Sequence, residues 1–303
     1  MFKPMRPALF IVLALLALER LNAEDYAARF KELQGEKAEG AKIDALLDEW
    51  RAKNPNDPNA WITSANYYFN ESVGPNISTK TPDKGDLTVK DRKTGKTAGS
   101  ISFKPNVAKT SRSATDLLQE ATTKFPDRLD IWCGLAFIYQ ESGDFDNELA
   151  TLKKMVAYTK AHPAGLKWLN GDPIEDPEDH YVPEKLHAYG QYYEQKENRQ
   201  DDKRWFQIAS LATQEYPNHA EGFNDSGGYY ADLQDWKKAR EMFEKARQLD
   251  SKSAGPLMNL GSVCLEAKDY PGARKYFEEA IKLDPNGPFA GEAKQALAKL
   301  KKK

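Results

Sequence analysis

The sequence predicts an all-α fold, namely a solenoid of antiparallel helix pairs that carries a small β-hairpin insertion. Three observations support this prediction. Near the C-terminus, residues recur at a fixed interval of 34 positions. Apolar side chains recur three and four positions apart, and one early segment alternates between apolar and polar residues instead. The first two patterns are typical of stacked amphipathic helices, and the third is typical of paired strands.

The repeating interval is clearest in small and aromatic residues. Gly227 recurs as Gly261, and Phe243 recurs as Phe277. Residues three and four apart share one face of a helix, so each half of the pattern describes one amphipathic helix. The glycines lie where two helix backbones are expected to approach closely, and the aromatic rings fill the gap to the next helix. The pattern predicts two complete repeats, at 220–253 and 254–287.

These residues resemble the tetratricopeptide repeat, whose pattern is W-x2-L-G-x2-Y, then A-x3-F-x2-A, then P. The last copy reads Leu257-x2-Leu260-Gly261-x2-Cys264, then Ala273-x3-Phe277-x2-Ala280, then Pro285. The resemblance implies a right-handed superhelix of antiparallel helix pairs with an extended concave binding face. The chain also looks like secreted or periplasmic bacterial members of that family that carry an insert in an early repeat.

Weaker copies of the pattern divide the rest of the chain, and a last helix is expected because terminal repeats need a cap. In chain order, the expected divisions are a signal peptide at 1–23, a degenerate helical pair at 24–57, an interrupted repeat at 58–128, a repeat at 129–162, a loop insert at 163–182, a degenerate repeat at 183–219, the repeats at 220–253 and 254–287, and a capping helix at 288–303.

The interruption at 74–109 is rich in Gly, Pro, Thr and Lys rather than in helix formers. Alternation at Leu87–Lys90 and Ser100–Phe103, on either side of the turn-forming Lys93–Lys96, predicts a β-hairpin. One hypothesis places this basic hairpin against the groove, where it shields or completes the binding site. A surface insertion with no binding role is the alternative.

An export signal is expected at residues 1–23. The basic Lys3 and Arg6 precede an apolar run, Ala8–Leu18, and small residues end at Ala23. This order is typical of a signal that is cleaved, here after Ala23. The apolar run is too short to span a bilayer, which takes about 20 residues. We therefore expect a secreted or periplasmic protein with no stable membrane span after cleavage; an uncleaved, membrane-anchored start is the alternative.

Charge and motifs do not favour nucleic acid, cofactors or catalysis. The formal net charge of −2 offers no basic surplus to neutralise phosphates. The sequence lacks a nucleophile elbow, a phosphate-cradling glycine loop and a paired catalytic carboxylate motif, so we expect no enzyme and no cofactor. The acidic stretch Asp172–His180 lacks the spacing of a calcium-binding loop. We expect a solvated loop there and leave a metal site open.

The resemblance places the binding groove on first-helix residues that lie between the packing positions. The candidate groove residues are Asn66, Phe69, Asn70, Phe137, Gln140, Glu141, Gln191, Glu194, Asn224, Gly228, Asp232, Met258, Ser262 and Glu266. Amide side chains suit a peptide, because they can bond its backbone. Gly228 is a helical glycine without a packing role in the pattern, and the hypothesis is that it gives a partner close access to the backbone. For each residue, a solvated surface position is the alternative.

We therefore expect a non-catalytic scaffold that binds another protein or peptide in the cell envelope or outside the cell. Some family members grip a terminal carboxylate with Lys and Arg, but the groove positions here carry Asn, Gln, Asp and Glu. The alternative function is a module that binds a glycan or cell-wall fragment through Trp61, Tyr67, Tyr68 and Phe69. That alternative requires exposed rings in these early repeats.

Overall fold

The computed structural model describes residues 25–73, 76–78, 87–90, 94–102, 114–194 and 199–300. The expected signal peptide at 1–23 lies outside these residues, as does much of the interruption at 74–109. The chain divides into two compact units. We call them the N-terminal unit (Met1–Met155 with Gly165–Pro173) and the C-terminal unit (Val156–Ala164 with Ile174–Lys303), and describe each by itself.

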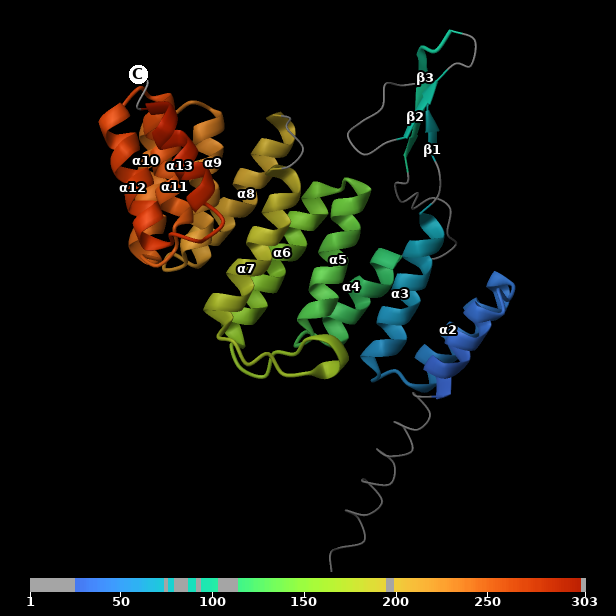
Figure 1. The fold of residues 1–303 in the computed structure, drawn as a ribbon. Coiled ribbons are helices and arrows are strands. Elements are labelled where there is room, and N and C mark those ends of the chain that lie inside the picture. The colour runs from blue at the N-terminus through green and yellow to red at the C-terminus, as the bar shows by residue number, and fades with distance from the viewer. Residues whose placement is uncertain are drawn as a thin grey trace, which may run out of the picture. The chain divides into compact units, whose positions relative to one another are not determined.

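Helices dominate the N-terminal unit (Figure 1). A helix at 25–35 precedes α2 (Gly40–Lys53), α3 (Pro58–Ser72), α4 (Ala114–Lys124), α5 (Leu129–Ser142) and the start of α6 (Phe145–Ala161). Consecutive helices from α2 to α5 pack against each other, including α3 and α4, although residues 73–113 separate those two in the chain. Their apolar faces, with the buried Trp50, Trp61 and Leu118, form one continuous hydrophobic core.

The described part of the interruption forms a three-stranded antiparallel sheet. Strand β2 (Leu87–Lys90) pairs with β3 (Thr97–Ser102), as the predicted hairpin requires. A further strand, β1 (Asn76–Ser78), pairs with the other edge of β3, so that the strand order is β1-β3-β2. The sequence did not predict β1, because three residues are too few to show an alternating pattern.

The C-terminal unit consists of stacked helix pairs followed by one more helix (Figure 1). Its elements are the end of α6, then α7 (Glu178–Glu194), α8 (Arg199–Glu215), α9 (Ala220–Asp232), α10 (Trp236–Leu249), α11 (Gly255–Glu266), α12 (Tyr270–Leu283) and α13 (Ala290–Leu300). Each pair packs within itself and against the next, and α13 covers α12. The predicted all-α fold of tetratricopeptide-type helix pairs is confirmed.

The turns inside the last two pairs share one local design. Asp235 and Asp269 are the residues before α10 and α12, and their carboxylates accept backbone N–H bonds from Lys238 at 3.2 Å and Gly272 at 3.0 Å. These bonds satisfy N–H groups that the first turn of a helix leaves free. The residue before each Asp has a left-handed backbone, with φ of 58° at Gln234 and 62° at Lys268.

Helix α7 begins at Glu178, inside the segment where the sequence predicts a loop insert. The Glu178 carboxylate accepts hydrogen bonds from the Tyr216 hydroxyl and, at 3.1 Å, from the Thr159 hydroxyl. These contacts join the start of α7 to α6 and to the residue after α8. Tertiary bonds, which local sequence does not show, therefore hold the first turn of this helix.

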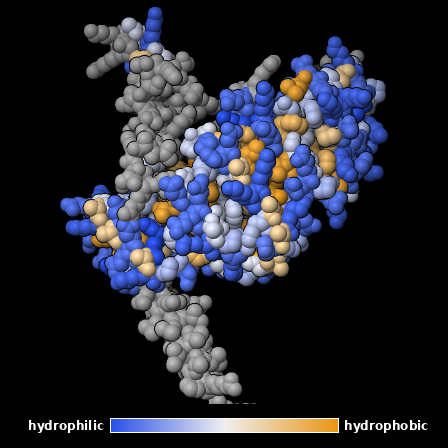
Figure 2. All heavy atoms as spheres, turned by 180° about the vertical axis from the view of Figure 1, so that it is seen from behind, coloured by the Kyte–Doolittle hydropathy of each residue, from blue (hydrophilic) through white to orange (hydrophobic). Residues whose placement is uncertain are grey.

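Apolar side chains are mostly buried, and the molecular face in Figure 2 is mainly hydrophilic with smaller hydrophobic patches. Among the helices that the structure describes, none combines the length and the apolar character that crossing a membrane requires.

Candidate functional site

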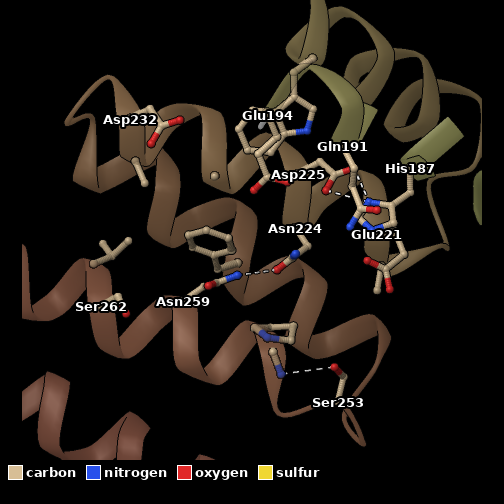
Figure 3. Close-up of a pocket in the computed structure, with 18 of the residues that line it drawn as sticks. His187, Gln191, Glu194, Glu221, Asn224, Asp225, Asp232, Ser253, Asn259 and Ser262 are labelled. Atoms are coloured by element: carbon tan, nitrogen blue, oxygen red, sulfur yellow. Dashed lines mark hydrogen bonds and ion pairs between the residues drawn. The ribbon is translucent and has the colours of Figure 1, made fainter. Parts of the chain in front are cut away.

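A pocket of about 700 Å³ opens in the C-terminal unit along the first helices of three successive pairs (Figure 3). Helix α7 contributes His187, Gln191 and Glu194 to its wall. The contributions of α9 are Ala220, Glu221, Asn224, Asp225, Gly228, Ala231 and Asp232, and those of α11 are Gly255, Pro256, Asn259, Ser262, Val263 and Glu266. Second-helix rings also reach the wall, namely Trp205, Trp236 and Phe243.

Helical periodicity explains why these residues face one space. On α9 the wall residues recur three, four or seven positions apart, which places them on a single stripe of the helix. At the edge of this stripe lies the packing glycine Gly227, whose added Cβ would stand 2.6 Å from Phe243 Cδ1. The same helix therefore packs at this edge and presents a polar stripe to the pocket.

An ion pair crosses from α7 to α9 at one end of the site (Figure 3). His187 Nδ1 lies 2.8 Å and 3.0 Å from the two carboxylate oxygens of Asp225. The hydrogen bond to Asp225 raises the pKa of His187, although burial opposes it. Burial raises the pKa of Asp225, which is only 4% exposed, against the opposing effect of His187. Because the pKa values of both His187 and Asp225 are raised, the pair holds its proton more tightly.

An amide pair crosses from α9 to α11 in the same way (Figure 3). Asn259 Nδ2 donates to Asn224 Oδ1 at 2.9 Å. Each carboxamide has one donor group and one acceptor oxygen. The bond between them leaves the Asn224 amide N–H2 and the Asn259 oxygen available for the donors and acceptors of a peptide backbone.

The Trp205 indole lies across two glycines. A Cβ added at Gly228 would stand 2.5 Å from Trp205 Cη2, so this glycine makes room for the ring. Gly228 therefore has a packing role, and it also lines the pocket. A Cβ at Gly190 would stand 3.5 Å from Trp205 Nε1 and 3.9 Å from Asp225 Oδ2. The indole nitrogen is buried and has no hydrogen-bond partner within the described part of the chain.

The pocket wall is acidic. Its carboxylates are Glu194, Glu221, Asp225, Asp232, Asp250 and Glu266, and the described wall residues include no Lys or Arg. Burial, followed by the nearby Asp225 charge, raises the pKa of Glu194. Burial, followed by the Asp202 charge, raises the pKa of Asp232. These carboxylates therefore lie where negative charge is unfavourable in the absence of a positive partner.

The structure brings half of the candidate groove residues together in this pocket. They are Gln191, Glu194, Asn224, Gly228, Asp232, Ser262 and Glu266. Met258 is not among the wall residues, because it is buried in the core beside α12. Its neighbour Asn259 takes the pocket position instead.

The remaining candidates lie in the N-terminal unit. Asn66 and Asn70 are exposed on α3 and Glu141 is partly buried on α5. The rings of Phe69 and Phe137 meet edge to face with centroids 5.8 Å apart, and Phe137 is 46% exposed. Gln140 differs from the expectation for a groove residue, because its side chain is buried.

Gln140 Nε2 donates to the fully buried Glu148 carboxylate at 2.9 Å. Glu148 stands where the repeat pattern has a small residue. The hydrogen bond from the Gln140 side-chain amide gives the buried Glu148 carboxyl group a polar partner inside the helix pair. This partner explains why a glutamate can occupy the position.

Sequence reasoning missed the other wall residues, among them His187, Trp205, Glu221, Asp225 and Asn259. The predicted stripe of groove residues on α9 and α11 is one residue narrower than the stripe that lines the pocket. Extending the stripe by one position on α9 and α11 adds Asp225 and Asn259, because a helix stripe covers neighbours at both three and four positions. No local signal identified Trp205, which belongs to a second helix.

Within the described residues, no group of three His, Cys, Asp or Glu side chains is close enough to hold a metal ion.

Comparisons with known proteins place one part of this chain in a family. No curated protein matches the sequence. Solved structures with similarity include YrrB, a tetratricopeptide protein with an unusual peptide-binding site (12% identity, 82% of this chain and 97% of that chain, TM-score 0.41). The TPR2B domain of yeast Sti1 in complex with an Hsp70 peptide is also similar (20% identity, 40% of this chain and 96% of that chain, TM-score 0.37). So is the TPR domain of Arabidopsis OM64 (18% identity, 41% of this chain and 98% of that chain, TM-score 0.36). The family model described as tetratricopeptide repeat matches residues 224–288, so this part of the chain is a tetratricopeptide repeat segment.

Proposed function

We propose that this protein is a non-catalytic scaffold that binds another protein or a peptide in the pocket along α7, α9 and α11. The observation that carries the proposal is that three successive first helices present polar side chains to one continuous pocket. The main functional asset of stacked helix pairs is such a long surface, which a single helix pair cannot form.

The chemistry of the wall suits a peptide backbone. Asn224 and Asn259 each keep one hydrogen-bonding group free for a ligand after bonding to each other. Gln191 and Ser262 add further groups of both kinds on the neighbouring helices. A peptide offers alternating N–H donors and C=O acceptors along its length, which matches polar groups spread over several helices.

The glycan alternative has less support. It requires exposed rings in the early repeats, but Trp61, Tyr67 and Tyr68 are buried in the core of the N-terminal unit, and Phe69 is partly buried against that core. Aromatic rings bind sugars through open faces, and buried rings do not offer them. The peptide-binding function is therefore preferred.

We also propose that the chain is exported and acts in the cell envelope or outside the cell. The order of basic, apolar and small residues before Glu24 supports this location. Fractionation of the producing cell, with N-terminal sequencing of the purified protein, tests it. A mature chain beginning at Glu24 outside the cytoplasm is expected; a cytoplasmic chain that keeps its first residues would contradict the proposal.

A random peptide library, selected against the purified protein, tests the binding function. Ser262→Trp places a large ring in the pocket, because Ser262 is an exposed wall residue. Glu278→Trp adds the same ring to an exposed position of α12 and serves as the matched control. Selected peptides are expected to bind the protein and the control but not Ser262→Trp. If no peptide is enriched, or if the enriched peptides bind Ser262→Trp equally well, the proposal fails.

A further inference from the structure

Four carboxylates of the pocket wall have no direct ion-pair partner among the described residues. Glu194, Glu221, Asp232 and Glu266 form no ion pair or hydrogen bond through their side chains within the described part of the chain. By contrast, Glu279 of α12, which lies outside the pocket wall, pairs with Arg247 at 2.8 Å. Unpaired acidic groups from three helices thus share one pocket.

The acidic groups are spread over three helices. Glu194 belongs to α7, Glu221 and Asp232 to α9, and Glu266 to α11. Within the described residues they do not converge as metal ligands do. Charges distributed along a pocket fit several cationic groups carried on one chain better than they fit a single ion.

A separate observation points to a ligand at the same place. Trp205 is 3% exposed and lines the pocket, yet its indole N–H has no hydrogen-bond partner among the residues that the structure describes. A buried donor without an acceptor is unfavourable, because its lost bond to water is not replaced. A Cβ added at Gly190 would stand 3.0 Å from Trp205 Cδ1, so this glycine lets the indole pack closely against α7. The indole nitrogen is a donor only, so the group that it requires is an acceptor such as a peptide carbonyl oxygen.

We infer that the ligand of this pocket is a cationic peptide segment, rich in lysine or arginine. Its side chains pair with Glu194, Glu221, Asp232 and Glu266, and one of its backbone carbonyl oxygens accepts the Trp205 N–H bond. This inference rests on the proposed peptide-binding function and specifies the chemical class of the partner. The raised pKa values of Glu194 and Asp232 support it, because a bound cation would relieve the unfavourable negative charge.

Three labelled peptides of equal length test the inference: one rich in Lys and Arg, one rich in Asp and Glu, and one rich in Asn and Ser. Their affinities are measured by fluorescence polarisation for the full protein and for two charge-matched triple variants. The pocket variant is Glu194→Gln, Glu221→Gln and Glu266→Gln. The control variant is Glu241→Gln, Glu278→Gln and Glu292→Gln, which changes the net charge equally at exposed positions outside the pocket.

The cationic peptide is expected to bind the native protein roughly tenfold or more tightly than the other two, and to bind more weakly as salt rises. The pocket variant should lose roughly tenfold in affinity for it, whereas the control should lose less than about twofold. Trp205→Phe, which keeps an aromatic ring but removes the N–H group, should weaken binding severalfold.

The outcomes separate this inference from the proposed function. If the neutral or acidic peptide binds as tightly as the cationic one, and Ser262→Trp abolishes that binding, the pocket binds peptides but the cationic class is wrong. Equal losses in the pocket and control variants would show attraction by net charge alone and overturn the inference. Unchanged affinity in Trp205→Phe would overturn the role of the indole. If none of the three peptides binds, the cationic class is overturned, and the library selection decides the proposed function separately.

Discussion

The ring of Phe277 lies directly against Gly261, so that a Cβ added to this glycine would stand 2.5 Å from Phe277 Cε1. Phe243 lies against Gly227 in the same way one repeat earlier, where an added Cβ would stand 2.6 Å from Phe243 Cδ1. The recurring glycine and phenylalanine are therefore two sides of one contact. This contact lets the two helices of each pair lie close together, with the buried aromatic ring of the second helix against the glycine of the first.

Gly261→Ala should destabilise the protein by about 1–3 kcal/mol, because the added methyl group overlaps a buried ring in a closely packed helix pair. Gly291 is also helical, but an added Cβ there meets no atom within 4 Å. Gly291→Ala should therefore stabilise the protein by about 0.5–1 kcal/mol. Urea unfolding of both variants checks the contrast. A Gly261→Ala variant as stable as the native chain would contradict the contact.

Lys268→Gly should stabilise the turn between α11 and α12. Lys268 has a φ of 62°, a left-handed conformation that costs a residue with a Cβ roughly 1 kcal/mol. Glycine adopts this conformation without that steric cost, so a gain of up to about 1 kcal/mol is expected in thermal unfolding. Lys268→Ala removes the same long side chain and keeps the Cβ, so it should give no gain. Equal effects of the two substitutions would show that backbone strain is not the cause.

The His187 and Asp225 pair should make stability depend on pH. The pKa of His187 is raised above its ordinary 6.5, mainly by its hydrogen bond to Asp225. The folded chain therefore holds this proton more tightly than the unfolded chain. The stabilisation is fully present below pH about 6.5 and is lost as pH rises through the folded-state pKa.

Titration of His187 by NMR measures this pKa directly. Asp225→Asn should lower it and should remove the corresponding fall in the unfolding midpoint as pH rises above about 6.5. A native His187 pKa at or below its ordinary value would contradict the ion pair.

Tyr216→Phe should destabilise the C-terminal unit by about 1–2 kcal/mol, because it removes a donor from the Glu178 carboxylate at the start of α7. Burial, followed by the bond to Glu178, raises the pKa of the Tyr216 hydroxyl. Tyr158→Phe is the control, since its ring stacks on His162 and this contact does not need the hydroxyl group. Thermal unfolding should show a loss for Tyr216→Phe alone. Equal midpoints would exclude an anchoring role for the bond.

The parts of the fold that were predictable are those in which partners are close in sequence. The two helices of a repeat are joined by a short turn, so the spacing of Gly261 and Phe277 already describes their contact. Asp235 and Asp269 accept N–H bonds from residues three positions later, so these contacts are local as well. By contrast, β1 and the early start of α7 depend on partners far along the chain, and neither has a strong local pattern.

The candidate site was predictable only in outline. Helical spacing placed Asn224 and Ser262 on a surface stripe, and both line one pocket in the structure. Spacing does not show how far a stripe extends before neighbouring helices bury it. Met258 and Gln140 occupy candidate groove positions, yet packing buries the first and a bond to Glu148 buries the second.

By itself, the sequence determined the helix pairs, the contacts inside each pair and the polar character of the first-helix stripes, because these follow from the spacing of residues within one repeat. Only the tertiary structure decided which polar residues meet. His187 and Asp225 lie 38 positions apart and come together because α7 and α9 stack. The same stacking gathers unpaired carboxylates from three helices around one space, and no single repeat contains that arrangement.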